Sequence, residues 1–153
     1  MTIERRTLAI GLAVVVASLA ANAAPPAPGV TVIPAEQVRA GFAKGMPLLE
    51  NDAFKIHASR RESAGRAEVH LRDTDTIYVL SGSANFVTGG RVVDAETVAP
   101  DEIRGASIEG GEVRRLAPGD VFVVPNGVPH WFQTVDGPLL YYVVKVTASG
   151  GSR

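Results

Sequence analysis

The sequence predicts an all-β protein, a sandwich or barrel of short strands preceded by one short helix. The 153 residues include 16 Gly and 10 Pro, which favours many turns over long helices. Short apolar or alternating segments also recur between turn signals that contain Gly and Pro. A chain of this length is enough for one such domain.

The first 23 residues have the three-part layout of a secretory signal peptide. Arg5 and Arg6 precede an apolar run over residues 8–21, and the Ala-Asn-Ala sequence at residues 21–23 fits a cleavage site between small residues. The apolar run is shorter than the about 20 residues that a membrane span needs. We therefore expect cleavage of residues 1–23, a periplasmic or secreted protein, and no stable membrane anchor in the mature chain.

The remaining chain divides into an extension, residues 24–46, and a β-barrel domain, residues 47–148. The extension is expected to contain a short strand at residues 30–33 and a helix at residues 35–42, which begins after Pro34. In the barrel domain, residues 95–111 are expected to form a long connection. The strands are expected at residues 47–49, 53–59, 66–71, 76–80, 83–88, 91–93, 113–116, 121–124, 130–135 and 139–146.

Charge and composition exclude several classes of function. The 15 Lys and Arg residues nearly balance 16 Asp and Glu, which argues against nucleic-acid binding through phosphate neutralisation. The chain has no Cys, so disulfides, thiolate catalysis and thiolate metal sites are excluded. Of three histidines, His57 alternates with Lys55 and Ser59 along an expected strand and is expected at a partly polar surface.

The other two histidines lie in a pattern that favours a metal site. Glu68 and His70 are two residues apart in an expected strand, so their side chains share one face. A hairpin at residues 72–74 would return Asp75 beside them, and His130 begins another strand. Two imidazoles and two carboxylates suit Fe(II), Mn(II), Ni(II) or Zn(II). The alternatives are hydrogen-bonded interior histidines, an ion pair of the glutamate with a neighbouring arginine, and a turn-capping aspartate.

The spacing of these residues resembles the first motif of the cupin superfamily, G-x5-H-x-H-x(3,4)-E-x6-G. Glu68 and His70 stand at the two His positions, Asp75 at the Glu position and Gly82 at the last Gly. The first Gly is missing, because Glu62 occupies its place. The resemblance therefore implies a metal site in which one imidazole is replaced by a carboxylate.

The second cupin motif, G-x5-P-x-G-x2-H-x3-N, is also similar. Gly119, Pro125, Gly127 and His130 stand at its first four positions, and Thr134 replaces the Asn. The resemblance implies a single-domain jelly-roll β-barrel with a divalent transition metal (Fe, Mn, Ni or Zn) inside its mouth. A set of two histidines and one carboxylate would still form a facial triad with open positions. The implied ligands are Glu68, His70, Asp75 and His130.

The expected function is a metal-dependent action on a small organic molecule, with oxygenase, isomerase and lyase reactions all open and no catalytic residue assigned. The alternative is a non-catalytic module that binds a metal or small ligand. Arginine pairs at residues 60–61 and 114–115 either lie on a solvated face or hold an anionic substrate. The strand at residues 139–146 is apolar on both faces, and many cupins form dimers, so a homodimer is expected too. The expected pocket lining is Ile77, Phe132 and Thr134.

Overall fold

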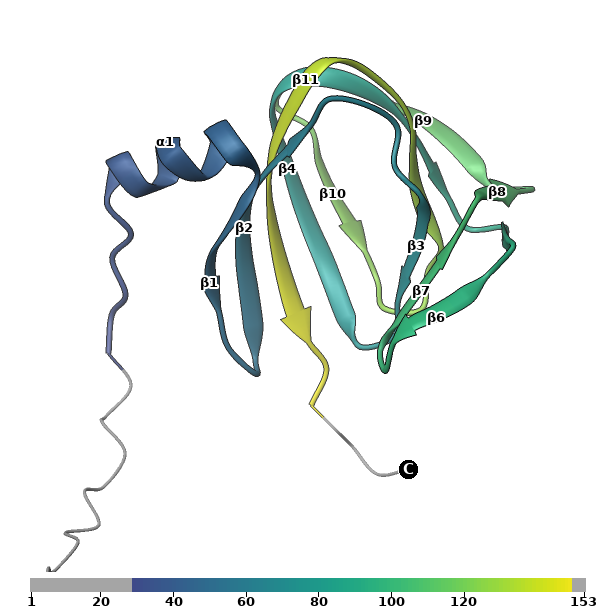
Figure 1. The fold of residues 1–153 in the computed structure, drawn as a ribbon, viewed down its shortest axis with the longest axis horizontal. Helices are drawn as coiled ribbons and strands as arrows, with labels where there is room; N and C mark the ends of the chain where they lie inside the picture. Colours follow the sequence, from purple (N-terminus) through teal and green to yellow (C-terminus); the bar gives the residue numbers. More distant parts are fainter. Residues whose placement is uncertain (1–28, 150–153) are drawn as a thin grey trace, which may run out of the picture. The chain divides into compact units, whose positions relative to one another are not determined.

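The computed structural model describes residues 29–149, which contain one helix and an antiparallel β-barrel (Figure 1). The expected signal peptide lies outside these residues. Residues 30–33 have no regular secondary structure, so the strand predicted there is wrong. Within residues 29–149, no helix is long and apolar enough to cross a membrane.

The predicted helix is confirmed as α1 (Ala35–Lys44), two residues longer than expected. It begins after Pro34 and ends at Gly45, which has a φ of 69° and donates its N–H to the Gly41 carbonyl at 2.8 Å. Gly41 is buried, and a Cβ there would lie 2.8 Å from the Leu48 side chain. The helix therefore packs closely against the first strands of the barrel.

Nine of the eleven strands within residues 29–149 form one antiparallel sheet, and β5 and β8 pair separately. This confirms the all-β jelly-roll prediction. Residues 95–111 contain β6, β7 and β8, so reading them as one long connection was wrong. The strands are β1 (Met46–Glu50), β2 (Phe54–Arg61), β3 (Ala67–His70), β4 (Asp73–Thr88), β5 (Arg91–Val93), β6 (Glu96–Ala99), β7 (Glu102–Gly105), β8 (Ser107–Glu109), β9 (Glu112–Leu116), β10 (Val121–Val124) and β11 (His130–Thr147).

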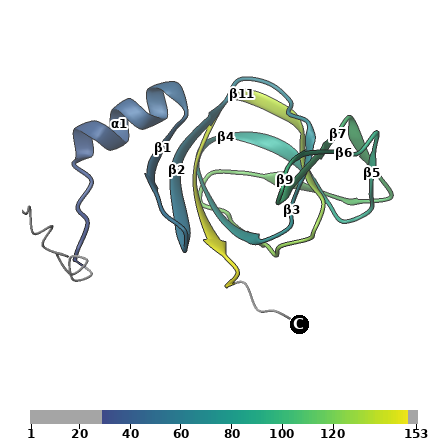
Figure 2. The same ribbon diagram turned by 60° about the horizontal axis from the view of Figure 1, so that its bottom comes forward.

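The two longest strands, β4 and β11, were each expected as two strands. They pair with each other along most of their length and curve around the barrel together (Figure 2). The turn signal at Gly82 is a bend inside β4: its φ is 77°, and a Cβ there would lie 2.5 Å from the Pro138 carbonyl oxygen. The register of β11 shifts at the same level, between Asp136 and Leu140. The bend lets one strand pair contribute two walls of the barrel, one with Asp75 and Lys145 and the other with His130.

The predicted hairpin between β3 and β4 does not form. β3 pairs with β7 and meets β11 at Glu68 opposite His130. Asp75 in β4 already has a neighbour on each side, Val124 of β10 and Lys145 of β11. Both hydrogen-bonding edges of β4 are therefore occupied at this point, and no edge is left for β3.

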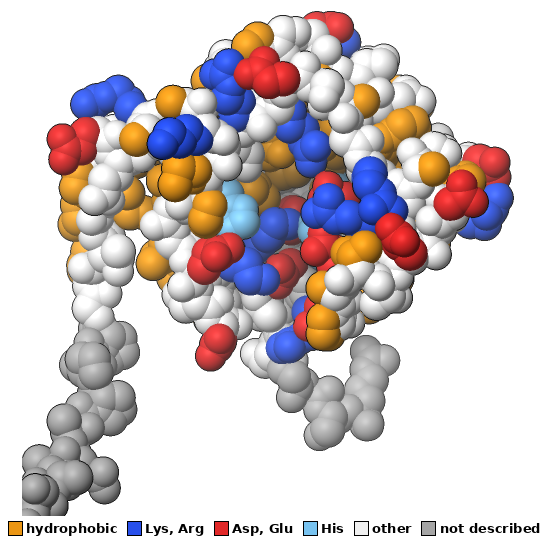
Figure 3. Space-filling view, in the orientation of Figure 1, with side chains coloured by type: hydrophobic (Ala, Val, Ile, Leu, Met, Phe, Trp, Pro, Cys, Tyr) orange, Lys and Arg blue, Asp and Glu red, His pale blue; other side chains and the backbone are white. Residues whose placement is uncertain are grey.

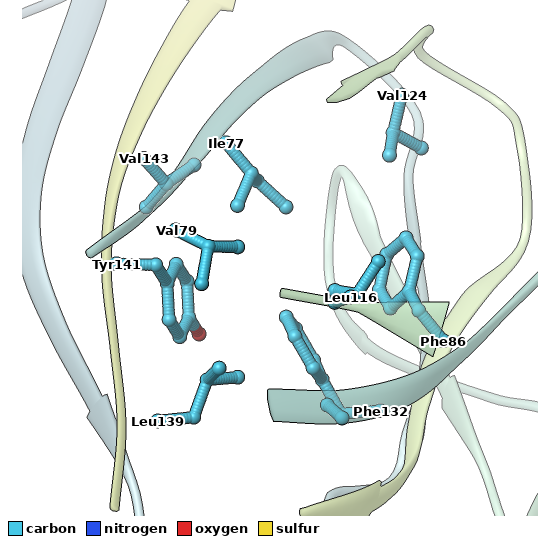
Figure 4. Close-up of a cluster of buried hydrophobic side chains, with 10 residues drawn as sticks. Ile77, Val79, Phe86, Leu116, Val124, Phe132, Leu139, Tyr141 and Val143 are labelled. Atoms are coloured by element: carbon cyan, nitrogen blue, oxygen red, sulfur yellow. The ribbon is translucent and has the colours of Figure 1, made fainter. Parts of the chain in front are cut away.

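One end of the barrel interior is filled by apolar side chains (Figure 4). The Phe86 and Phe132 rings lie 4.7 Å apart between centroids, and Phe132 lies 5.2 Å from Tyr141. Burial of these side chains supplies the main stabilisation of the fold. The buried cluster comprises Ile77, Val79, Ala84, Phe86, Leu116, Val124, Phe132, Leu139, Tyr141 and Val143.

Candidate metal centre

The other end of the barrel opens into a cavity of about 500 Å³ lined mostly by polar side chains. Along β2, the alternate residues Lys55, His57, Ser59 and Arg61 all line this cavity, because successive side chains of a strand point to opposite faces. Figure 3 shows acidic and basic side chains gathered around a hollow, with histidine among them. The polar character predicted for this face is present, but the surface position expected for His57 is wrong, because its side chain lines the cavity.

Three predicted ligands converge here: Glu68, His70 and His130. One ligand atom from each lies within 4.8 Å of the other two. Glu68 and His70 are alternate residues of β3, and Glu68 lies directly opposite His130 in the pairing of β3 with β11. Strand register alone therefore brings the three side chains to one face.

The turn before β11 holds both histidines in place. The Gly127 N–H donates to the His70 carbonyl at 2.8 Å, and the Asn126 side-chain amide donates to the Leu71 carbonyl at 3.1 Å. The Val128 carbonyl lies 3.1 Å from His130 Nδ1. A carbonyl only accepts, so Nδ1 carries the proton and the Nε2 lone pair of neutral His130 is free to bind a metal.

Both histidines lie in surroundings that favour the neutral imidazole. Burial lowers the pKa of His130, which is 4% exposed. Burial, together with the nearby Lys145 ammonium, lowers the pKa of His70. The Nε2 atom of His70 is buried and has no hydrogen-bond partner. A neutral imidazole with an unpaired buried nitrogen is the form that ligates a metal.

The two oxygens of Glu68 face different neighbours. Oε1 lies 3.3 Å from an Arg61 nitrogen and 3.6 Å from an Arg104 nitrogen, whereas Oε2 lies 3.6 Å from His70 Nε2. Burial is the largest single influence on the pKa of Glu68 and acts to raise it, but neighbouring side chains, foremost Arg61 and Arg104, together hold the pKa below its usual range. Glu68 is thus ionised, with one oxygen directed towards the histidines.

Asp75 lies at the edge of this group. Its Oδ2 is 3.6 Å from His70 Nε2, but the Lys145 ammonium donates to the same oxygen at 2.6 Å. The two residues are directly opposite each other in β4 and β11. Asp75 is not part of the close triad, and its role as a metal ligand stays a prediction. Lys145 was missed by the sequence analysis, although it alternates with Tyr141 and Val143 on the cavity-facing side of β11.

The expected pocket lining is placed only in part. Ile77 and Phe132 line the cavity, but Thr134 does not. A register shift between Phe132 and Thr134 reverses the alternation of β11. Thr134 is exposed as a result, and its hydroxyl accepts the Asn85 N–H at 3.2 Å.

The two arginine pairs have different surroundings. Arg61 lines the cavity, whereas Arg60 pairs with Glu62 at 2.5 Å. Arg114 and Arg115 lie on a solvated face and pair with acidic side chains there. The sequence left it open whether either pair holds an anionic substrate. Of these four arginines, Arg61 is the one that remains placed to do so.

The donor set fits a divalent transition metal. It combines two neutral imidazoles with one carboxylate, which is the ligand chemistry of a facial triad with open coordination positions. The unpartnered Nε2 of His70 lies within the cavity wall where such an ion would bind. Fe, Mn, Ni and Zn all accept this set.

Comparisons with known proteins agree with the fold and motifs. Residues 37–153 match the family model described as Cupin. A protein from Bacillus halodurans is similar in structure, with a TM-score of 0.54 and 16% identity over 82% of this chain and 86% of that one. Hydroquinone 1,2-dioxygenase from Sphingomonas sp. TTNP3, with 4-hydroxybenzoate bound, has a TM-score of 0.50 and 14% identity over 69% of this chain and 66% of that one.

KdgF from Halomonas sp. has a TM-score of 0.49 and 17% identity over 69% of this chain and 80% of that one. No curated protein matches the sequence. The two structures with TM-scores of 0.50 and 0.54 show a shared fold alone, at 14% and 16% identity. The family model covers most of the chain, including the residues of both motifs. The chain therefore belongs to the cupin family.

Proposed function

We propose that this protein binds one divalent transition metal between Glu68, His70 and His130 and acts with it on a small organic molecule. The main support for this proposal is that three donor side chains converge at the buried His70 Nε2, which has no hydrogen-bond partner. A buried polar atom without a partner costs free energy, which metal ligation would recover. The cavity of about 500 Å³ has the size of a small-molecule site.

When bound, the metal supplies Lewis-acid chemistry or, if redox-active, chemistry with O₂. The protein's own groups orient the site: the Val128 carbonyl fixes the tautomer of His130, and Arg61 and Arg104 hold the charge of Glu68. Phe132 is buried and supplies an apolar part of the cavity wall. Three protein ligands leave coordination positions free, which favours an enzyme of the oxygenase, isomerase or lyase type.

A second candidate function is a non-catalytic module that binds the metal or a small ligand. The observation in its favour is the pairing of the cavity carboxylates other than Glu68, each of which contacts a basic side chain. None of them is therefore free to act as a general base. The pairs are Glu50 with His57, Asp73 with Lys55, Asp75 with Lys145 and Glu102 with Arg104.

Metal analysis of the purified, untagged protein tests the site. We expect about one Fe, Mn, Ni or Zn per chain in the wild type and less than about a tenth of that in His70→Ala and His130→Ala. His57→Ala is the matched control, because this histidine lines the same cavity but pairs with Glu50 at 2.8 Å outside the triad. Full metal content in both triad variants would contradict the proposal.

Substrate screening separates the two candidate functions. The metal-loaded protein is offered catechols, thiols and diketones, and oxygen uptake and products are followed. Turnover that His130→Ala loses supports the enzyme, whereas binding without turnover across the panel supports the module. Absence of oxygen uptake with formation of another product leaves the isomerase and lyase reactions.

We further propose a periplasmic or secreted location, which the layout of residues 1–23 supports, and a homodimer. Val121 and Val123 of β10 are about 60% exposed and Tyr78 of β4 is 44% exposed, and these strands are paired. Apolar side chains gathered on a sheet face are typical of an interface. The mass of the mature chain tests cleavage after residue 23, and an uncleaved chain contradicts it. Light scattering tests the homodimer, and a monomer at micromolar concentration contradicts it.

A further inference from the structure

Arg61 differs from the other cations that line the cavity. Its carboxylate contact is Glu68 at 3.3 Å, longer than the about 2.7–2.9 Å of a charge-assisted hydrogen bond. The positive charge of Arg61 is therefore loosely compensated, whereas each other cavity cation has a carboxylate within 2.6 Å. Those pairs are Lys55 with Asp73, Arg66 with Glu96, Arg104 with Glu102 and Lys145 with Asp75.

The Arg61 guanidinium is held in place by groups other than a close carboxylate. Its Nε donates to the Tyr141 hydroxyl at 3.1 Å, and its Cζ lies 4.5 Å from the centre of the Phe132 ring. A Cβ on Gly65 would lie 2.4 Å from its Nη1, so the missing side chain of Gly65 makes room for the guanidinium. The side chain is only 23% exposed. A planar donor group fixed in this way is preorganised for a ligand.

The charge balance of the cavity favours an anionic ligand. Five Lys or Arg and five Asp or Glu residues line it, so these charges cancel. The proposed divalent metal would add two positive charges and would draw on Glu68, the acidic partner of Arg61. The uncompensated charge would then be positive and located beside Arg61.

We propose that Arg61 binds the carboxylate, or a similar small oxyanion, of the ligand that enters this cavity, and that the ligands are therefore small organic acids. The inference deepens the proposed function and rests on it, since the metal supplies the excess charge. Arg61 would donate two parallel N–H groups to the carboxylate of the acid. The corresponding neutral amide could not take the place of the acid in this pairing.

Calorimetric titration of the metal-loaded protein tests this inference. The probes are benzoate, lactate and succinate, each compared with its amide. We expect at least one acid to bind the wild type and its amide not to bind. Arg61→Met, which keeps the length of the side chain, should weaken acid binding by about tenfold to a hundredfold. Arg60→Met is the control, since Arg60 pairs with Glu62, and should stay within about twofold of the wild type.

Metal content measured on the same samples separates the possible failures. A wild type without metal contradicts the proposed function and, with it, the charge argument. A metal-loaded wild type that binds none of the acids contradicts the Arg61 inference alone, as does equal acid binding by Arg61→Met and Arg60→Met. If Arg61→Met loses the metal, Arg61→Lys decides: it keeps the charge beside Glu68 but not the paired donors, and acid affinity equal to that of the wild type overturns the inference.

Discussion

The two ends of the barrel interior are built by the same two strands, yet they differ in almost every chemical respect. β4 supplies Asp75 at one end and Val79 nearer the other, and β11 supplies Lys145 and Leu139 in the same way. At the apolar end, Val79 and Leu139 are fully buried and belong to the apolar cluster. One end of the interior therefore stabilises the fold, and the other end accommodates charged side chains.

The polar end carries a cost in stability that the apolar end does not. Within residues 29–149, the buried side-chain atoms without a hydrogen-bond partner are His70 Nε2 and Asp75 Oδ1, and both lie at the polar end. Unpaired buried polar groups are destabilising and are found where function requires them. We therefore expect that substitutions at the apolar end lower the free energy of unfolding without changing the metal content.

The largest effect on stability is expected at the apolar end, from Leu116→Ala. Leu116 is fully buried in the apolar cluster, so truncation removes transfer free energy and leaves a cavity. The free energy of unfolding should fall by about 2–5 kcal/mol, measured by urea denaturation of the metal-free protein. Metal content per folded chain should stay that of the wild type. Loss of metal without loss of stability would break the division between the two ends.

A smaller loss is expected from Lys145→Met at the polar end. Removing the ammonium leaves the Asp75 carboxylate buried without its ion-pair partner. Breaking a fully buried pair costs about 3–5 kcal/mol, and we expect about 2–3 kcal/mol here because Lys145 keeps 14% exposure. Urea denaturation of the metal-free protein measures the loss.

A double variant provides the control for this ion pair. Lys145→Met combined with Asp75→Leu removes both charges and should return to within about 1 kcal/mol of the wild type. If the two losses instead add, the pair does not account for the stability at this point. Metal content of the double variant also tests Asp75, since an unchanged metal content would contradict its predicted role as a ligand.

Local features of the fold could be predicted from the sequence, whereas strand pairing could not. Alternating side chains and turn residues located β2, β9 and β10 to within about two residues, because these signals are short-range. The bend at Gly82 looks like a turn in sequence, since both require a positive φ. The pairing of β3 with β7 and β11 depends on residues about 35 and 60 positions away, and no local pattern encodes it.

The same distinction applies to the site. Motif spacing identified Glu68, His70 and His130, which the structure brings together. Arg61 and Lys145 lie outside the motifs, and their place in the cavity follows only from knowing which face of β2 and β11 points inward. The alternation of Arg61 with the polar residues of β2 was a usable signal. Lys145 faces Asp75 through the pairing of distant strands, which sequence spacing does not encode.

The smallest effect is a dependence of stability on pH that belongs to the polar end. Burial lowers the pKa of His70 and His130 in the folded state, while the unfolded chain keeps ordinary values near 6.5. Below about pH 6.5 the unfolded state therefore binds protons that the native histidines do not. The free energy of unfolding should then decrease with falling pH, by at most about 1.4 kcal/mol per unit for each histidine.

Urea denaturation of the metal-free protein at pH 7.5 and 5.5 measures this decline. The pKa values of Glu68 and Asp73 are lowered in the folded state, so the stability that these carboxylates contribute is lost only as the pH falls below their ordinary pKa, near 4. The interval from pH 7.5 to 5.5 therefore isolates the histidines. His130→Asn should reduce the decline, because one of the two buried imidazoles is gone. A decline that this variant leaves unchanged would contradict a contribution from His130 to the pH dependence. A reduced decline would show that keeping a neutral imidazole buried there costs stability, which metal binding would offset.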